Sequence, residues 1–147
     1  MEKSTWLLVA NASKARLYSL CKARLLQSAN SKDLTLEQEC KHDESRKKGM
    51  DLITDKLGSH GHGTFVEATD PKHHEAERFA IELNEKLDVA RKEHQYRELI
   101  IAAPPAFLGI LKKHMPHDIN KLIFKTIEKD YTFHDERALV SALENYL

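Results

Sequence analysis

The chain has 147 residues, of which 41% are hydrophobic and 31% are charged, and its formal net charge at pH 7 is zero. This length suits one domain around one hydrophobic core, so we predict a single domain over residues 1–147. A zero net charge excludes a global positive field, so RNA binding would need a local basic patch, and no DNA partner is expected. No stretch resembles a signal peptide or a membrane-spanning helix. We therefore expect a cytoplasmic protein with no membrane partner.

The N-terminal third predicts three antiparallel strands. Thr5 to Ala10 is apolar and β-rich, NASK (11–14) is a turn signal, and residues 15–20 alternate in polarity, which together predict a hairpin. LTLEQEC (34–40) also alternates, which places Leu34, Leu36 and Cys40 on one face of a half-exposed third strand. Cys40 and Cys21 lack CxxC spacing, so we interpret both as reduced packing residues, with a disulfide as the alternative. No cofactor is expected.

Residues 41–70 form a long polar region, in which MDLITDKL predicts a short helix. Connections of this length are uncommon in compact domains and are usually functional or unstructured. We therefore predict a long flexible loop over 41–70.

The second half alternates helices with strands. Pro71 stands where a helix begins, and apolar residues then recur at helical spacing through residue 90. LIIAA (99–103) predicts a strand buried on both faces, ended by two prolines. AFLGILKKHM (106–115) predicts a short helix, in which Gly109 is expected to allow close packing against the sheet. A last strand is expected over 123–128 and a final helix over 135–147.

The predicted order is β-β-β-α-β-α-β-α. The first three strands are antiparallel, and the last two are each reached through a helix and so run parallel. This is the element order of the α/β ribonuclease H-like fold. We therefore predict a five-stranded mixed sheet in the order 3-2-1-4-5.

Three stretches resemble the host-attachment proteins of bacteria. They are WLLVANASKARLYSL at the start, ERFAIELNEKLDVARKEHQYRELIIAAPPAFLGILKKHM in the middle, and IEKDYT before the final helix. The APPAFLG stretch with the spaced KDYT is the most specific part. The family has been related to the middle domain of archaeo-eukaryotic release factors, which has the ribonuclease H-like fold. The resemblance implies a cytoplasmic protein that acts at ribosomes, and it brings no established biochemical activity.

Nuclease chemistry is disfavoured. A two-metal nuclease needs several carboxylates at strand ends to hold its metal ions. The first strand ends in Asn11, where many relatives have Asp, and the fourth ends in AAPP. Since Asn11 has no charge to offer a metal, we interpret it as a residue that shapes the turn.

The stretch GSHGHGTF (58–65) occupies the place of the release-factor loop that carries Gly-Gly-Gln. It contains no Gln and no Gly-Gly pair, so the release mechanism is not carried over. We favour a solvated connector. The alternative is a hydrolase of a phosphoester or peptidyl ester that uses His60 or His62 as a donor or base. His60, His62, His73 and His74 match no established zinc spacing, so no metal is predicted and these four are only weak ligand candidates.

Basic residues supply the candidates for RNA or anion binding, because such groups can engage phosphates without an overall positive charge. Asn11 and Pro104 are expected to meet at the carboxyl ends of the strands, where ligands bind in α/β sheets. The candidate residues are Asn11, Lys14, Arg16, Arg46, Lys47, Lys48, Lys112 and Lys113, with Lys22 and Arg24 adding positive charge near the hairpin.

We expect a binding protein in preference to an enzyme. The leading hypothesis is a ribosome- or RNA-associated factor similar to the release-factor middle domain. A hydrolase that uses His60 and His62 is the first alternative. A protein-interaction module in adhesion regulation is the second, and a homodimer stays open.

Overall fold

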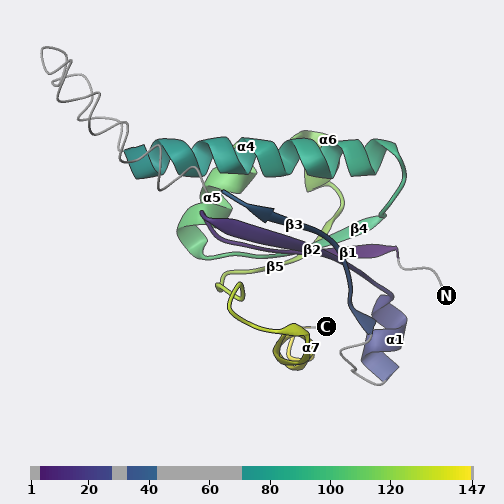
Figure 1. Cartoon of the computed structure of the whole chain (residues 1–147). Helices are drawn as coiled ribbons and strands as arrows, with labels where there is room; N and C mark the ends of the chain where they lie inside the picture. Colours follow the sequence, from purple (N-terminus) through teal and green to yellow (C-terminus); the bar gives the residue numbers. More distant parts are fainter. Residues whose placement is uncertain (1–3, 28–32, 43–70, 147) are drawn as a thin grey trace, which may run out of the picture.

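The computed structural model describes residues 4–27, 33–42 and 71–146, and the structural statements below refer to these. A five-stranded sheet lies between two layers of helices (Figure 1). In chain order the elements are β1 (Thr5–Ala10), β2 (Lys14–Leu20), α1 (Lys22–Gln27), β3 (Thr35–Lys41), α4 (Pro71–Lys92), β4 (Glu98–Ala102), α5 (Pro105–Lys113), α6 (His117–Asn120), β5 (Ile123–Ile127) and α7 (Glu136–Leu143). Most of the predicted loop over 41–70 falls outside the described residues.

The strand order is β3-β2-β1-β4-β5, which confirms the predicted mixed sheet. β1 pairs with β2 antiparallel and with β4 parallel, and β5 is parallel to β4. β1 is buried along its whole length because it is the central strand and both of its faces are covered.

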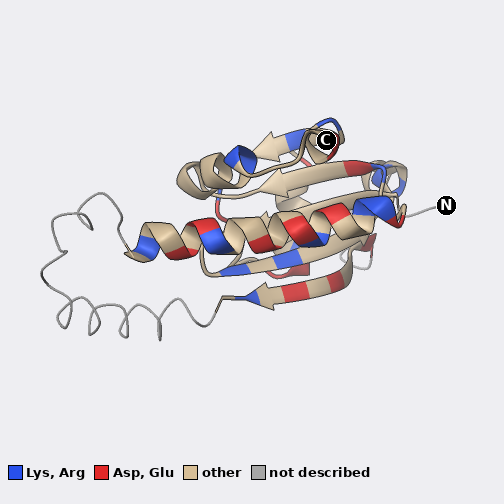
Figure 2. Cartoon of the chain, turned by 90° about the horizontal axis from the view of Figure 1, so that it is seen from above, with Lys and Arg blue, Asp and Glu red and all other residues tan. Residues whose placement is uncertain are grey.

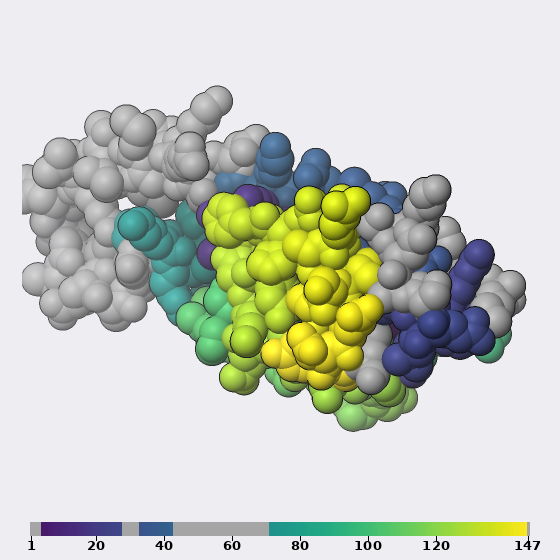
Figure 3. Space-filling model, turned by 90° about the horizontal axis from the view of Figure 1, so that it is seen from below, coloured from purple at the N-terminus to yellow at the C-terminus, as the bar shows by residue number. Residues whose placement is uncertain are grey.

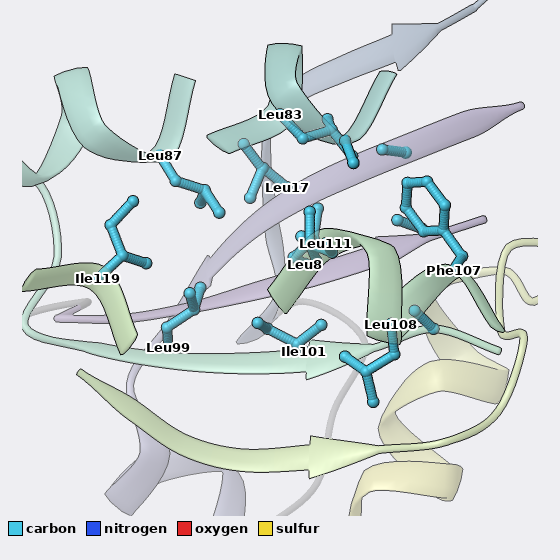
Figure 4. Packing of buried hydrophobic residues seen from close by; sticks show 14 of the residues in the cluster. Leu8, Leu17, Leu83, Leu87, Leu99, Ile101, Phe107, Leu108, Leu111 and Ile119 are labelled. Carbon is cyan, nitrogen blue, oxygen red and sulfur yellow. The ribbon is translucent and has the colours of Figure 1, made fainter. Parts of the chain in front are cut away.

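Each face of the sheet has its own core. The upper core lies under α4, α5 and α6, where Leu8 and Ile101 of the sheet meet Leu83 and Leu111 of the helices (Figure 4). The lower core contains residues of α1 and α7. Seen from below, the chain after β5 covers the middle of the lower face (Figure 3). Among the described helices, none combines the length and the apolar character needed to cross a bilayer.

β3 departs from the regular alternation that its sequence predicts. Its pairing passes from Leu17–Gln38 to Tyr18–Leu36, so Glu37 is an extra residue in a β-bulge. Leu34 therefore packs in the lower core, Cys40 packs against the upper core, and Leu36 is 47% exposed. The prediction that these three share one face is wrong, because alternation assumes one residue opposite each residue of the partner strand.

The helices follow the predicted apolar pattern, with shorter ends. α4 begins at Pro71 as predicted, and its apolar stripe is buried. α7 begins at Glu136 because the Asp135 carboxylate caps it by accepting a hydrogen bond from the Ala138 N–H at 2.8 Å. The short helices α1 and α6 were not predicted. Trp6 is 2% exposed and belongs to the core, and the two cysteines form no disulfide.

Gly109 is exposed on α5, and a methyl group at its Cα would have no atom within 4 Å. Its backbone φ is not positive. The prediction that Gly109 allows close packing against the sheet is therefore wrong, because the residue points away from the sheet.

Gly109→Ala should stabilise the protein by about 0.5–1 kcal/mol, since alanine restricts the unfolded chain and fits a helix interior. Urea unfolding followed by the fluorescence of Trp6 measures this change. Ala106→Gly, at an exposed position of the same helix, should shift stability in the opposite direction. A loss of stability in Gly109→Ala would contradict the assignment of open space at this position.

Candidate functional site at the carboxyl end of the sheet

Three parallel strands end at the same edge of the sheet, on the left in Figure 1. Asn11 follows β1 and Pro104 follows β4. Because Val9 pairs with Ala102, Asn11 and Pro104 lie two residues beyond the same pair. Asp130 follows β5 at this edge. Ligands of open α/β sheets favour such an edge, so the candidate site is placed here.

Asn11 holds this edge together through both ends of its amide. Its Oδ1 accepts hydrogen bonds from the backbone N–H groups of Ser13 and Lys14 at 2.8 and 3.0 Å, which closes the β1–β2 turn. Its Nδ2 donates to Asp130 Oδ2 at 3.1 Å and to Thr132 Oγ1 at 3.0 Å. The turn interpretation of Asn11 is confirmed. An ionised aspartate at this position could not make the two donated bonds, because a carboxylate has no hydrogen to donate.

Asp130 is the carboxylate nearest to this turn. Burial alone would raise its pKa, but hydrogen bonds from the Thr132 hydroxyl and N–H and from Asn11 outweigh burial, and the pKa lies below its usual value. The charge of Lys14 lowers it further. Asp130 is therefore an ionised acceptor that fixes the chain after β5. The described residues contain no group of three His, Cys, Asp or Glu side chains that could hold a metal.

Arg16 fastens the segment after β5 to the sheet. Its Nη2 donates to the carbonyl oxygens of Tyr131, Thr132 and His134 at 3.3, 3.0 and 2.8 Å. Its Nη1 donates to the Tyr18 hydroxyl at 2.6 Å. These bonds give Arg16 a structural role, and its role as an anion contact stays a prediction.

The Tyr18 hydroxyl continues the network that Arg16 begins, because it donates to Glu136 Oε1 at 2.9 Å. Burial first, and then the bond to Glu136, raise the pKa of Tyr18 to about 12. The neutral hydroxyl therefore links β2 to the first turn of α7.

Lys14 and Lys41 lie directly opposite each other on β2 and β3. The His42 N–H donates to the Ser13 carbonyl at 2.8 Å, so Ser13 and His42 form a hydrogen-bonded pair. Hydrogen-bonded and non-hydrogen-bonded pairs alternate along antiparallel strands, so Lys14 and Lys41 form a non-hydrogen-bonded pair, in which the side chains are close. Among the described residues, neither ammonium is in an ion pair. The Lys14 Nζ lies 4.0 Å from the centroid of the Phe133 ring, and Phe133 is 79% exposed. We call Lys14, Lys41 and Phe133 the Lys–Phe surface.

The Lys–Phe surface faces the lower side of the sheet. Ala15 and Cys40 belong to the upper core, and alternation directs their neighbours Lys14 and Lys41 the other way. Lys14 was predicted as a binding residue, whereas Lys41 and Phe133 were not. Lys41 belongs to this surface because β3 pairs with β2 and so places Lys41 opposite Lys14. No local pattern in the sequence predicts that the two lysines are neighbours.

The other basic candidates lie elsewhere. Lys112 and Lys113 end α5 in the upper layer, and the Lys113 Nζ is 3.2 Å from Glu77 Oε1. Lys22, beyond the other end of β2, pairs with Glu98 at 3.0 Å and lies over the Phe124 ring. Arg46, Lys47, Lys48, His60 and His62 lie outside the described residues.

A pair formed by His42 and Glu75, which the sequence analysis missed, joins the end of β3 to α4. His42 Nε2 lies 2.7 Å from Glu75 Oε2, Glu75 is 2% exposed, and the His42 ring stacks on Phe79 at 5.2 Å between centroids. His73 and His74, by contrast, are exposed in the first turn of α4. One signal was available: Glu75, Phe79 and Leu83 follow each other at four-residue spacing, which places the carboxylate on the buried stripe.

The fold and the site together define an α/β protein with a polar, well-anchored edge at the carboxyl ends of its parallel strands. The amide and carboxylate there hold the chain in place, Lys41 and the ring of Phe133 are exposed, and Lys14 is half-buried. The chain belongs to the family described as proteins required for attachment to host cells, which matches residues 6–143. It is also similar to an uncharacterized protein of Rickettsia prowazekii, with 34% identity over 114 residues that cover 75% of this chain and 73% of that protein.

The resemblance to the host-attachment proteins is thus confirmed. The family description gives a phenotype, attachment to host cells, and names no molecular activity.

Proposed function

We propose that the protein is an RNA-associated factor that binds the ribosome through the Lys–Phe surface. One observation carries the proposal, namely the cross-strand lysines Lys14 and Lys41, neither of which forms an ion pair with a described residue, with Lys14 over the exposed ring of Phe133. Like charges directly opposite each other destabilise a strand pair, and a bound phosphate would relieve that repulsion. An exposed aromatic ring next to the phosphate site offers a face on which a base can stack.

We also propose a ribonuclease H-like fold related to the release-factor middle domain. The sheet order β3-β2-β1-β4-β5 with its mixed strand directions supports this. The stretch 58–65 lacks the Gly-Gly-Gln of release factors, so the proposal is binding at the ribosome, in the cytoplasm, without hydrolysis of peptidyl-tRNA.

Lys14→Ala/Lys41→Ala should weaken binding to purified bacterial ribosomes and to single-stranded RNA. Two lost phosphate contacts should reduce the slope of log K against log salt by about 1.4, at about 0.7 per contact for single strands. Co-sedimentation and fluorescence anisotropy across a salt series measure both. Lys92→Ala/Lys121→Ala is the matched control, since it removes the same charge from residues that pair with Asp88 and Asp118.

Phe133→Ala should weaken the same binding by about 5- to 100-fold, as expected for one lost stacking contact, while Phe133→Tyr should retain it. Equal losses in the two double lysine variants would mean that only net charge matters. Ribosome binding that is absent at every salt concentration would remove the proposal.

A second candidate function is a protein-interaction module in adhesion regulation. The family description favours it, as does the outer edge of β3, which pairs with no strand in the described part of the chain. It predicts a protein partner whose capture is unaffected by ribonuclease treatment. The hydrolase hypothesis stays a prediction, because His60 and His62 lie outside the described residues.

A further inference from the structure

A groove of about 390 Å³ runs between the edge strand β3 and the helix α4. Gln38 forms its strand side. Glu82, Glu85, Lys86 and Val89 of α4 line the other side with Glu93, which follows the helix, so three carboxylates face one ammonium. Acidic residues mark both β3 and the adjacent length of α4 (Figure 2). Val89 is 55% exposed, so the groove combines an apolar contact with negative charge.

The backbone of β3 is available along this groove. Within the described ranges, β3 pairs only with β2. Because the pair Ser13–His42 is hydrogen-bonded, alternate residues of β3 turn their N–H and C=O groups away from β2. These residues are Glu39 and Lys41, beyond the bulge at Glu37. An unpaired edge of this kind is a template for an added strand.

We propose that this groove binds an extended basic peptide of a partner protein, which adds to β3 as a sixth strand. Alternate residues of an added strand point to the same face, so every second side chain would face α4. Burial raises the pKa of Cys40 on β3, and the charges of Lys86, which lowers it, and of Glu82, which raises it, also act on this thiol, so this length of α4 lies beside the regular part of the strand. Lysines or arginines at alternate positions would therefore meet Glu82 and Glu85.

The lengths of the two elements agree with this arrangement. Glu82 lies on α4 and Glu93 directly follows the last residue of this helix, eleven residues on, which corresponds to about 16 Å along a helix. A strand of about five residues covers the same distance at about 3.3 Å per residue. The bound segment would thus be short, with basic residues at its first, third and fifth positions.

A second copy of this chain fits the edge less well. Pairing β3 with β3 of another copy would bring Glu37 and Glu39 of one chain beside those of the other. Like charges on paired strands are destabilising. A basic peptide would be attracted to Glu37 and Glu39, so the charge of this edge favours a peptide of opposite sign.

The test uses the full chain and a fluorescent peptide of alternating lysine and valine, KVKVK, with EVEVE as the acidic counterpart. KVKVK should bind at least ten times more tightly than EVEVE by fluorescence anisotropy at low salt. Glu82→Gln/Glu85→Gln should weaken that binding by at least fivefold. Glu128→Gln/Glu144→Gln, which removes the same charge from exposed positions away from the groove, should leave it unchanged.

Strand addition has its own readout. The amides of Glu39 and Lys41 should shift in the NMR spectrum on binding and exchange more slowly, and KVPVK, in which proline removes a backbone donor, should bind more weakly. Equal binding of KVKVK and EVEVE, an equal loss in both glutamine variants, or shifts confined to other surfaces would overturn the proposal. Dimerisation through β3 in sedimentation velocity would also overturn it. These variants leave Lys14 and Phe133 intact, so the outcome is independent of the RNA proposal.

Discussion

His42→Ala should destabilise the protein by about 2–4 kcal/mol, the range expected when one partner of a buried ionisable pair is removed. The substitution would leave the buried carboxylate of Glu75 with Arg78, which is 3.4 Å away and whose side chain is 47% exposed. It would also remove the ring that stacks on Phe79. Urea unfolding followed by circular dichroism and by the single tryptophan, Trp6, measures the change.

A second His–Glu pair, which joins α4 to the residue after α5, provides the control for this prediction. His114 Nε2 lies 3.1 Å from Glu77 Oε1, but the two side chains are 27% and 24% exposed. His114→Ala should therefore cost less than about 1 kcal/mol. The double variant His42→Phe/Glu75→Leu should be more stable than His42→Ala, because no charged group is left buried without a partner. Equal losses of stability in His42→Ala and His114→Ala would contradict the argument that burial makes the His42–Glu75 pair the more stabilising of the two.

Arg16→Lys should destabilise the protein by about 2–3 kcal/mol, although the charge is retained. The guanidinium donates to three backbone carbonyls and to the Tyr18 hydroxyl, and a single ammonium cannot reach this set of acceptors. Buried acceptors left without a donor cost about 1–3 kcal/mol each. Urea unfolding of the variant measures the loss, and hydrogen exchange should show faster exchange of amides in residues 131–134.

Arg97→Lys is the control for the Arg16 prediction, since Arg97 is exposed. It should change stability by less than about 0.5 kcal/mol. An Arg16→Lys protein as stable as the control would show that the carbonyls find water or other donors. Because Arg16 holds the segment that carries Phe133, the variant should also weaken RNA binding if the Lys–Phe surface is the binding site.

Most of the sheet could be predicted from sequence because its pattern is local. A continuous apolar run predicts β1, and the turn residues after it predict the hairpin. The apolar stripe after Pro71 predicts α4, and the helices between later strands force a parallel arrangement. These features depend on neighbours within a few residues, so they can be read without knowledge of the fold. The strand order 3-2-1-4-5 also needs the match of the element order to the ribonuclease H-like fold, because local patterns do not specify which strands lie side by side.

The incorrect predictions concern short helices and positions whose surroundings depend on another element of the fold. α1 and α6 have 6 and 4 residues, too few for a helical period to be recognised. The bulge at Glu37 depends on how β2 and β3 twist against each other, and it places Leu34 and Cys40 against opposite cores, although alternation predicts one face for both. Gly109 was assigned to the sheet side of α5, whereas the position of that helix over the upper core leaves it exposed.

The sequence by itself determined the strands, the helices α4, α5 and α7, the family resemblance and the turn at Asn11. Only the tertiary structure decided what these residues meet. Pairing of β2 with β3 sets Lys14 against Lys41, and the fold of the chain after β5 places Phe133 beside Lys14, 119 residues away in sequence. The same is true of His42 and Glu75. Contacts of this range depend on the packing of whole elements, and no spacing within the sequence encodes them directly.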